Sequence, residues 1–138
     1  MASGVAVNQQ CLDEFQKLKL GKEYKYVVFT LNTSNTEVIV EKASTSTDYD
    51  EFLKDLPETG CRWAVYDFEF DLGEGKRKKI CFFSWSPDDA KIKQKMLYAS
   101  SKDALRKPLV GIALDIQGTD YSEVSYESVL EKASRNTR

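Results

Sequence analysis

The sequence predicts an α+β fold in which a central mixed sheet is sandwiched by helices on both faces. The 138 residues, 41% of them hydrophobic, are enough for a single domain with one substantial core. Segments with helical spacing are interspersed with pairs of strand-like segments joined by short polar turns. The runs VVF and CFF, inside two of those strand-like segments, are apolar at every position, which indicates a sheet covered on both sides.

The N-terminal region is predicted to contain a tail and a helix. Residues 1–7, MASGVAV, are small and precede any capping residue, so we expect a flexible tail ahead of a domain that spans 8–138. Asn8 is the expected N-cap of the helix, and Gly21 is its expected stop. Leucine and phenylalanine recur between them at helical spacing.

The middle of the chain is predicted to form two hairpins separated by a short helix. Thr47 is the expected N-cap of that helix, and Pro57 ends it because proline disrupts a helix interior. The strands are rich in β-branched and aromatic residues and are joined by polar or glycine-containing turns. They occupy residues 24–32 and 37–42 in the first hairpin, and residues 62–70 and 78–85 in the second.

The C-terminal part is predicted to contain a long helix, a strand and a last helix. The long helix follows Asp88 and ends before Pro108, which lacks an N–H and disfavours helix in the residue before it. Residues 111–117, GIALDIQ, are expected to form the strand. Ser125 is the expected N-cap of the last helix, which extends to Arg135.

Positive charge is concentrated in one part of the chain. Residues 76–107 contain ten Lys or Arg and three Asp or Glu, although the whole chain carries a net charge of -2. This distribution indicates a directed electrostatic contact rather than a general affinity for nucleic acid or membranes. The KRKK run at 76–79 follows two glycines but lacks the spacing of a phosphate-binding loop. It is either a solvated hairpin tip or a nuclear-import patch.

The residue types argue against an enzyme, a metal site or a cofactor. The chain has no histidine, which removes the usual general base and the Ser-His and Cys-His nucleophile pairs. The three widely spaced cysteines indicate reduced thiols rather than disulfides or a zinc site. The acidic run YDFEFD at 66–71 could supply an acid–base pair, but a solvated strand face is the simpler interpretation. Without a signal peptide or a long apolar run, the chain is expected to be soluble and intracellular, with no transmembrane segment.

The long helix has two apolar faces of unequal width. The wider one is expected to face the core. Most cations of the helix lie around a second stripe of Ile92, Met96 and Ala99. This pattern favours docking to a protein with an acidic rim over an anionic lipid headgroup or nucleic acid, although an ordinary solvated face stays possible on this evidence. The core face consists of Leu97, Tyr98, Ala104 and Leu105.

The block FFSWSPDDAKIKQKMLYASSKDALRK at 82–107 resembles the signature of the ADF/cofilin family of actin-depolymerising proteins. LKLGK (18–22), YDEFLKDLPETGC (49–61) and DIQGTDYSEVSYESVLEKASR (115–135) are similar to the same family, most of all to its fungal members. The resemblance covers almost the whole chain and implies a single ADF-homology domain. It implies binding to monomeric and filamentous actin, preferably ADP-bound, with altered filament twist, severing and depolymerisation. The alternative is a domain of this fold that binds actin or phosphoinositide without severing.

The resemblance also implies two binding surfaces. The first would contact actin in both monomers and filaments, and the second would contact filaments only. The first consists of Ser3, Gly4, Val5, Lys93, Lys95, Met96, Lys102, Asp103, Arg106 and Lys107. The second consists of Arg77, Lys79, Glu131, Lys132 and Arg135.

Regulation and location are implied by the same resemblance. Ser3 would be a phosphorylation site, because a phosphate adds about -1.5 to -2 charge and opposes docking onto an acidic surface. Phosphatidylinositol bisphosphate headgroups would compete with actin for the basic helix. The protein would act as a monomer with cofactor proteins of filament disassembly, in the cytoplasm at cortical actin. A nuclear location is the alternative that applies if the KRKK run is an import patch. Pro108 and Trp63 depart from the family pattern, and Pro108 makes the end of the helix at Arg106 and Lys107 the least secure part of the comparison.

Overall fold

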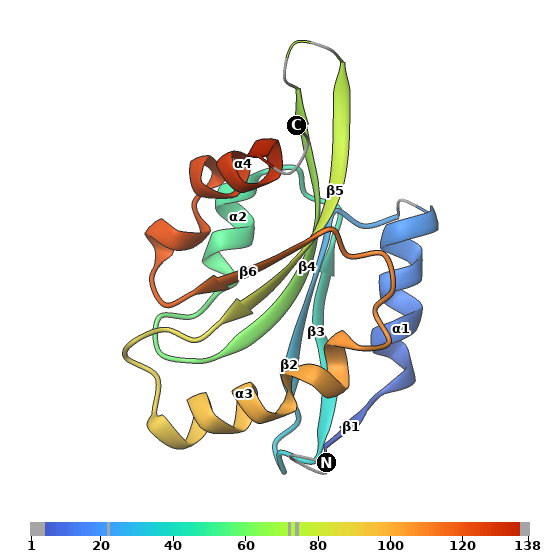
Figure 1. Cartoon of the computed structure of the whole chain (residues 1–138). Helices are drawn as coiled ribbons and strands as arrows, with labels where there is room; N and C mark the ends of the chain where they lie inside the picture. Colours follow the sequence, from blue (N-terminus) through green and yellow to red (C-terminus); the bar gives the residue numbers. More distant parts are fainter. Residues whose placement is uncertain (1–4, 22, 72, 74, 136–138) are drawn as a thin grey trace.

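The computed structural model describes residues 5–21, 23–71, 73 and 75–135 of the chain. Within this part of the chain, six strands form one mixed sheet in the order β1-β3-β2-β4-β5-β6 (Figure 1). The outer strands β1 and β6 pair in parallel with β3 and β5, and the other pairs are antiparallel. The strands are β1 (Ala6–Val7), β2 (Tyr26–Leu31), β3 (Glu37–Ser44), β4 (Arg62–Asp71), β5 (Lys76–Trp85) and β6 (Leu114–Gly118). The predicted α+β fold with a central mixed sheet is confirmed.

Each face of the sheet carries a hydrophobic cluster that is closed by two helices (Figure 1). On one face, the first and third helices contribute Phe15 and Leu105 to the cluster, and on the other the second and fourth helices contribute Phe52 and Val129. Because successive side chains of a strand point to opposite faces, β4 and β5 supply apolar residues to both clusters. The helices are α1 (Gln9–Gln16), α2 (Tyr49–Lys54), α3 (Ile92–Arg106) and α4 (Tyr126–Arg135).

Secondary structure begins before the predicted domain boundary. Ala6 and Val7, which the sequence assigned to a flexible tail, form β1 beside β3. Residues 1–4 of the predicted tail lie outside the described residues. Asn8 caps α1 as predicted, because its side-chain oxygen accepts a hydrogen bond from the Gln10 N–H at 2.8 Å.

Other element boundaries also differ from the predictions. The strand expected at 24–32 is shorter, and β3 extends to Ser44 instead of residue 42. The strand β5 begins at Lys76 instead of residue 78, because its pairing with β4 continues to the end of the hairpin.

Thr47 was expected to cap the second helix, but the N-cap is Asp48, whose carboxylate accepts the backbone N–H two residues on at 3.0 Å. A carboxylate also complements the positive end of the helix. The strand expected at 111–117 begins only at Leu114. Gly111 has a φ of 106°, a left-handed backbone that turns the chain before the strand can start.

The β4–β5 hairpin projects beyond the rest of the molecule (Figure 1). Each strand has ten residues, and the pairing runs without interruption from Arg62 opposite Trp85 to Asp71 opposite Lys76. The inner half is buried between the helices, whereas the basic residues 76–79 near the outer end are exposed or half-buried. The hairpin therefore carries a cationic tip on a strand pair anchored in the core.

Replacing Phe52 of α2 with alanine should strongly destabilise the fold. The Phe52 ring is fully buried and lies 4.9 Å from the ring of Tyr66 and 5.0 Å from those of Tyr26 and Phe83, measured between centroids. The cavity and the lost apolar burial should lower the free energy of unfolding by about 3–5 kcal/mol. Urea unfolding followed by tryptophan fluorescence measures this loss, with exposed Leu20→Ala as the control. A loss below about 1 kcal/mol would contradict a core role for Phe52.

Candidate functional site

The outer side of α3 presents an apolar stripe to solvent. Ile92 is 73% exposed and Met96 is 66% exposed, and Ala99, the next residue of the stripe, is also exposed. Tyr98 is buried on the opposite side of the helix, as predicted. The core prediction is wrong for Ala104, which is exposed, because it lies at the edge of the buried arc when residues are placed 100° apart. Exposed apolar side chains gathered in this way are typical of a contact surface.

Cations surround this stripe, as the sequence predicted. Lys93 and Lys107 are exposed and Lys102 is half-buried, and none of the three forms an ion pair with another described residue. Lys95 is half-buried, and its Nζ donates a hydrogen bond to the carbonyl oxygen of Asp88 at 2.9 Å. This bond ties α3 to the loop before it, so Lys95 has a structural role whatever else it contacts.

Arg106 is held by its own chain at the end of α3. Its Nε lies 2.8 Å from Asp115 Oδ1 and its Nη2 lies 3.2 Å from Asp115 Oδ2, which is a bidentate pair with β6. The guanidinium also lies over the Phe82 ring, 5.8 Å from its centroid. Hydrogen bonds from Arg106 lower the pKa of Asp115 below its usual range. Arg106 therefore fastens the end of α3 to the sheet.

The described start of the chain lies beside α3. Val5 is half-buried and packs against the cluster beneath α1 and α3, and β1 contacts α3. Ser3 and Gly4, the other predicted tail contacts, lie outside the described residues. The chain thus enters the fold at the edge of the α3 surface.

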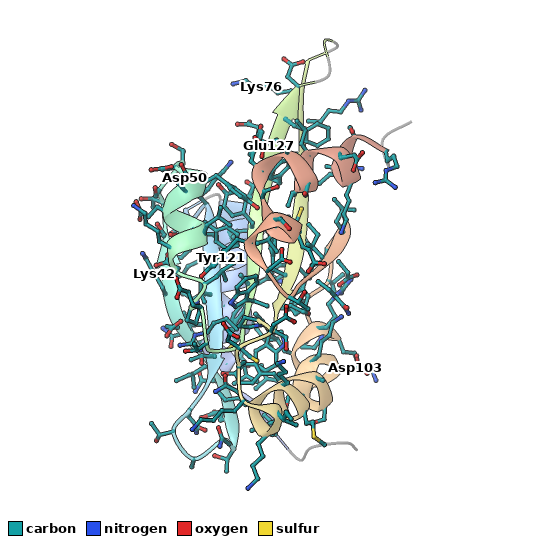
Figure 2. The ribbon with its side chains drawn as sticks, turned by 90° about the vertical axis from the view of Figure 1, so that its left-hand side faces the viewer. Lys42, Asp50, Lys76, Asp103, Tyr121 and Glu127 are labelled. Carbon is teal, nitrogen blue, oxygen red and sulfur yellow. The ribbon has the colours of Figure 1, made fainter. Side chains whose placement is uncertain are left out.

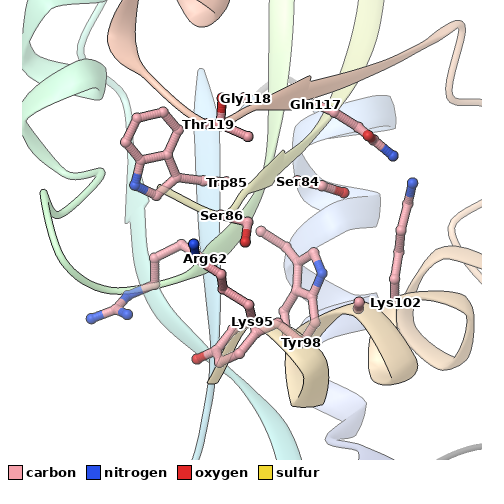
Figure 3. Close-up of a pocket in the computed structure, with 12 residues that line it drawn as sticks. Arg62, Ser84, Trp85, Ser86, Lys95, Tyr98, Lys102, Gln117, Gly118 and Thr119 are labelled. Carbon is pink, nitrogen blue, oxygen red and sulfur yellow. The ribbon is translucent and has the colours of Figure 1, made fainter. Parts of the chain in front are cut away.

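A half-open pocket of about 390 Å³ lies between α3 and the sheet (Figure 3). Trp63, Ser84 and Gln117 line it and form one row across β4, β5 and β6, because Ser84 is paired with both of the others in the sheet register. Ala99 and Lys102 line the pocket from α3. No pattern in the sequence indicated this pocket.

The second predicted surface combines the β5 end of the hairpin with α4. Arg77 and Lys79 alternate with Cys81, which packs in the cluster beneath α4, so both point to the face that carries α4. Lys79 Nζ donates a hydrogen bond to the Ala133 carbonyl oxygen of α4 at 3.1 Å. On the exposed side of α4, Arg135 Nη2 lies 3.3 Å from Glu131 Oε1. The structure therefore brings the hairpin and α4 parts of this surface together.

The two surfaces lie at different ends of the molecule. Figure 2 shows Lys76 of the hairpin and Glu127 of α4 toward one end, and Asp103 of α3 toward the other. Lys132, the remaining predicted residue of the second surface, is half-buried on α4. The molecule can therefore present these surfaces to two separate partners at once.

Cysteines and potential metal ligands are the side chains of the described residues that bear on a reactive site. Among them there is no group of three or more side chains suited to hold a metal ion. Burial raises the pKa of the Cys11 and Cys81 thiols to about 12 and also raises the pKa of Cys61. These buried thiols stay protonated at neutral pH and are poor nucleophiles. In the part of the chain that the structure describes, no helix has both the length and the apolar character to cross a membrane.

Comparisons with known proteins agree on one family. The family model for cofilin/tropomyosin-type actin-binding proteins matches residues 4–134. The cofilin of Mycosarcoma maydis is 67% identical over 138 residues, with 99% of both chains covered. The cofilin of Schizosaccharomyces pombe is 62% identical over 133 residues, which is 96% of this chain and 97% of the relative.

Solved structures agree with the sequence comparisons. The crystal structure of Streptomyces griseoflavus cofilin superposes with a TM-score of 0.92 at 62% identity, covering 96% of this chain and 98% of that one. Plasmodium berghei actin depolymerization factor 2 superposes with a TM-score of 0.81 at 31% identity, covering 96% and 97% of the two chains.

Asp115→Asn should destabilise the protein in a way that depends on pH. Because Arg106 lowers the folded-state pKa of Asp115, the pair contributes stability above the unfolded pKa of about 3.9 and loses it as the pH falls through the folded pKa. Both side chains are partly exposed, so the loss at neutral pH should be at most about 1 kcal/mol.

Thermal unfolding of wild type and variant between pH 7 and pH 2 tests this expectation. The exposed Asp103→Asn variant, which removes a carboxylate from α3, is the control. A stability difference that persists unchanged at the acidic limit would show that the ion pair is not its source.

Proposed function

Because the chain belongs to the cofilin/tropomyosin-type actin-binding protein family, we propose that it binds monomeric and filamentous actin and severs and depolymerises filaments. It would prefer ADP-bound actin. The observation that carries the proposal is the outer face of α3, where an exposed apolar stripe lies among cations. The stripe offers apolar area to bury, and the cations steer and orient an acidic partner surface.

The first surface is assigned to contacts made with actin in both monomers and filaments. Within it, we assign direct contact with the partner to Lys93, Lys102 and Lys107, which form no ion pair with a described carboxylate. Arg106 would act by positioning α3 through Asp115. The whole set comprises Ser3, Gly4, Val5, Lys93, Lys95, Met96, Lys102, Asp103, Arg106 and Lys107.

The second surface, formed by Arg77, Lys79, Glu131, Lys132 and Arg135, is assigned to a neighbouring actin subunit of the filament. A ligand shifts a conformational equilibrium only through different affinities for the two states. If both surfaces are satisfied only in an altered arrangement of the two subunits, binding stabilises that arrangement and changes the filament twist. Strain would then concentrate where decorated and bare filament meet, which is where severing is expected.

The cations that would bind actin also offer a way to regulate that binding. Phosphorylation of Ser3 would add negative charge to the N-terminal tail and oppose docking onto an acidic surface. Phosphatidylinositol bisphosphate headgroups would compete with actin for the cations of α3. We place the protein as a monomer at cortical actin in the cytoplasm, working with cofactor proteins of filament disassembly, and the KRKK run at 76–79 is the candidate nuclear-import patch.

Cosedimentation with ADP-actin and ATP-actin filaments, combined with fluorescence imaging of single filaments, tests the function. We expect tighter binding to ADP filaments and a higher frequency of breaks. Binding without breaks would favour the alternative of a domain that binds actin without severing. Absence of both filament and monomer binding would overturn the proposal.

The Arg77→Ala, Lys79→Ala double variant should retain affinity for monomeric actin while losing filament binding and severing. Both side chains point toward α4 and belong to the second surface only. The Lys76→Ala, Lys78→Ala variant removes the same charge from the opposite face of β5 and is the matched control. Monomer affinity is measured by fluorescence titration and filament affinity by cosedimentation. An equal loss in both assays would refute two separate surfaces.

Ser3→Asp should weaken binding to both monomeric and filamentous actin. The added charge mimics part of a phosphate and opposes docking onto an acidic surface. Affinity of wild type and variant for monomeric actin measures the effect, with Thr45→Asp in the exposed loop before α2 as the control. Unchanged affinity of Ser3→Asp would count against a contact by the tail.

A further inference from the structure

The row Trp63–Ser84–Gln117 leaves a depression on the surface of the sheet because the side chain of its central residue is small. The aromatic and amide side chains stand on either side of Ser84 in adjacent strands, and all three line the pocket beside α3 (Figure 3). Ala99, one of the four α3 residues that line the pocket, is also small. A serine on the sheet and an alanine on the helix thus keep open a space that larger side chains would close.

The hydroxyl of Ser84 is buried without a partner. Among the described residues, Ser84 Oγ is the one buried side-chain oxygen or nitrogen that lacks a hydrogen bond. Two other polar groups that line the pocket are engaged elsewhere: Tyr98 Oη bonds with Thr30 Oγ1 and accepts from the Leu31 N–H, and Trp85 Nε1 donates to the Pro57 carbonyl oxygen. A ligand atom that accepts a hydrogen bond from this buried hydroxyl would remove the energetic cost of leaving it unpaired.

The pocket wall has the charge of an anion-binding site. Of its twelve lining residues, three are cations and none is acidic. Two of these cations are already bound, since Arg62 pairs with Glu41 at 2.8 Å and Lys95 donates to a backbone carbonyl. Lys102 has no ion pair among the described residues, and it stands on the same side of the pocket as Gln117 (Figure 3).

The carboxylate of Asp115 on β6 interacts electrostatically with Lys102, whose charge helps to lower the Asp115 pKa. It is occupied by Arg106 through two hydrogen bonds, so its charge is largely balanced within the molecule. Lys102 is therefore the cation of the pocket that is available to a ligand. Its amine and the Ser84 hydroxyl can donate to the same anion, while Trp63 and Ala99 offer apolar contact to the rest of the ligand.

We propose that this pocket receives one acidic side chain of actin, whose carboxylate binds Lys102 and Ser84 and whose methylenes pack against Trp63 and Ala99. The proposal rests on the proposed function, because the pocket opens beside the Met96 stripe of α3. A partner that covers the stripe lies over Ala99, which belongs to both the stripe and the pocket wall. A glutamate side chain fits this pocket, because its methylenes can contact the apolar walls and its carboxylate can accept hydrogen bonds from the donors at one side.

A carbodiimide cross-linking experiment tests the proposal directly. This reagent joins an amine to a carboxylate only when the two are in contact. Wild type bound to monomeric actin should yield a peptide in which Lys102 is joined to an acidic residue of actin, identified by mass spectrometry. Lys102→Arg keeps the positive charge but lacks the primary amine that the reagent couples to a carboxylate, so that peptide should be absent from its complex with actin.

Filling the pocket gives a second measurement. Ser84→Leu should weaken monomer affinity by about tenfold or more, because the added side chain occupies the space and removes the donor. Thr47→Leu, in the exposed loop before α2, is the matched control. Thermal unfolding establishes that Ser84→Leu is folded before its affinity is interpreted, and the cross-link does not depend on that variant.

The outcomes of these experiments distinguish a failure of the pocket proposal from a failure of the proposed function. If wild type does not bind actin at all, the proposed function fails. If wild type binds but no Lys102 cross-link forms and folded Ser84→Leu binds normally, the pocket proposal is overturned while the function stands. If glutarate alone shifts the Ser84 and Gln117 amide resonances and actin does not, the pocket takes a free small anion and the proposal is also overturned.

Discussion

The structure depends on the burial of the β4–β5 strand pair from both sides. Trp63 and Phe82 pack under α1 and α3, whereas Tyr66 and Phe83 pack under α2 and α4. A sheet that is apolar on both faces cannot remain exposed to water, so each face requires its own layer of helices. Each helix covers the sheet with only one of its sides. The other side of α3, and the hairpin end that extends past the helices, are thereby left available for a partner.

The elements and their order could be predicted because they follow from periodicity and from local stop signals. Asn8 was found from its chemistry as an N-cap, and the two faces of α3 from helical spacing. Predictions went wrong where two neighbouring residues could play the same part. Thr47 and Asp48 can both cap a helix, and only the backbone geometry selects Asp48. The β1 strand was missed because two residues carry no period and owe their structure to pairing with β3.

The residues of the candidate surfaces were found more easily than their roles. A cation in a sequence can serve a partner or the chain's own packing, and charge alone does not distinguish the two. Arg106 lies nine residues from Asp115, but the pair forms only because the chain turns from α3 back into β6. Lys79 binds a carbonyl of α4 that lies 54 residues away. These bonds depend on the tertiary fold, so no local pattern could have shown them.

Some cations of the candidate surfaces bind groups of the chain itself, and others are available to a partner. A binding surface needs both kinds. A surface that must distinguish states of its partner has to be rigid, since a flexible one adapts to each state and loses the difference in affinity. Arg106, Lys95 and Lys79 supply that rigidity by fixing both ends of α3 and the contact between hairpin and α4. Lys93, Lys102 and Lys107 can then act on the partner from a fixed frame. The same fold that buries the strand pair thus holds the two candidate surfaces at a set distance, and in the proposed function this set distance would allow binding energy to be converted into a change of filament geometry.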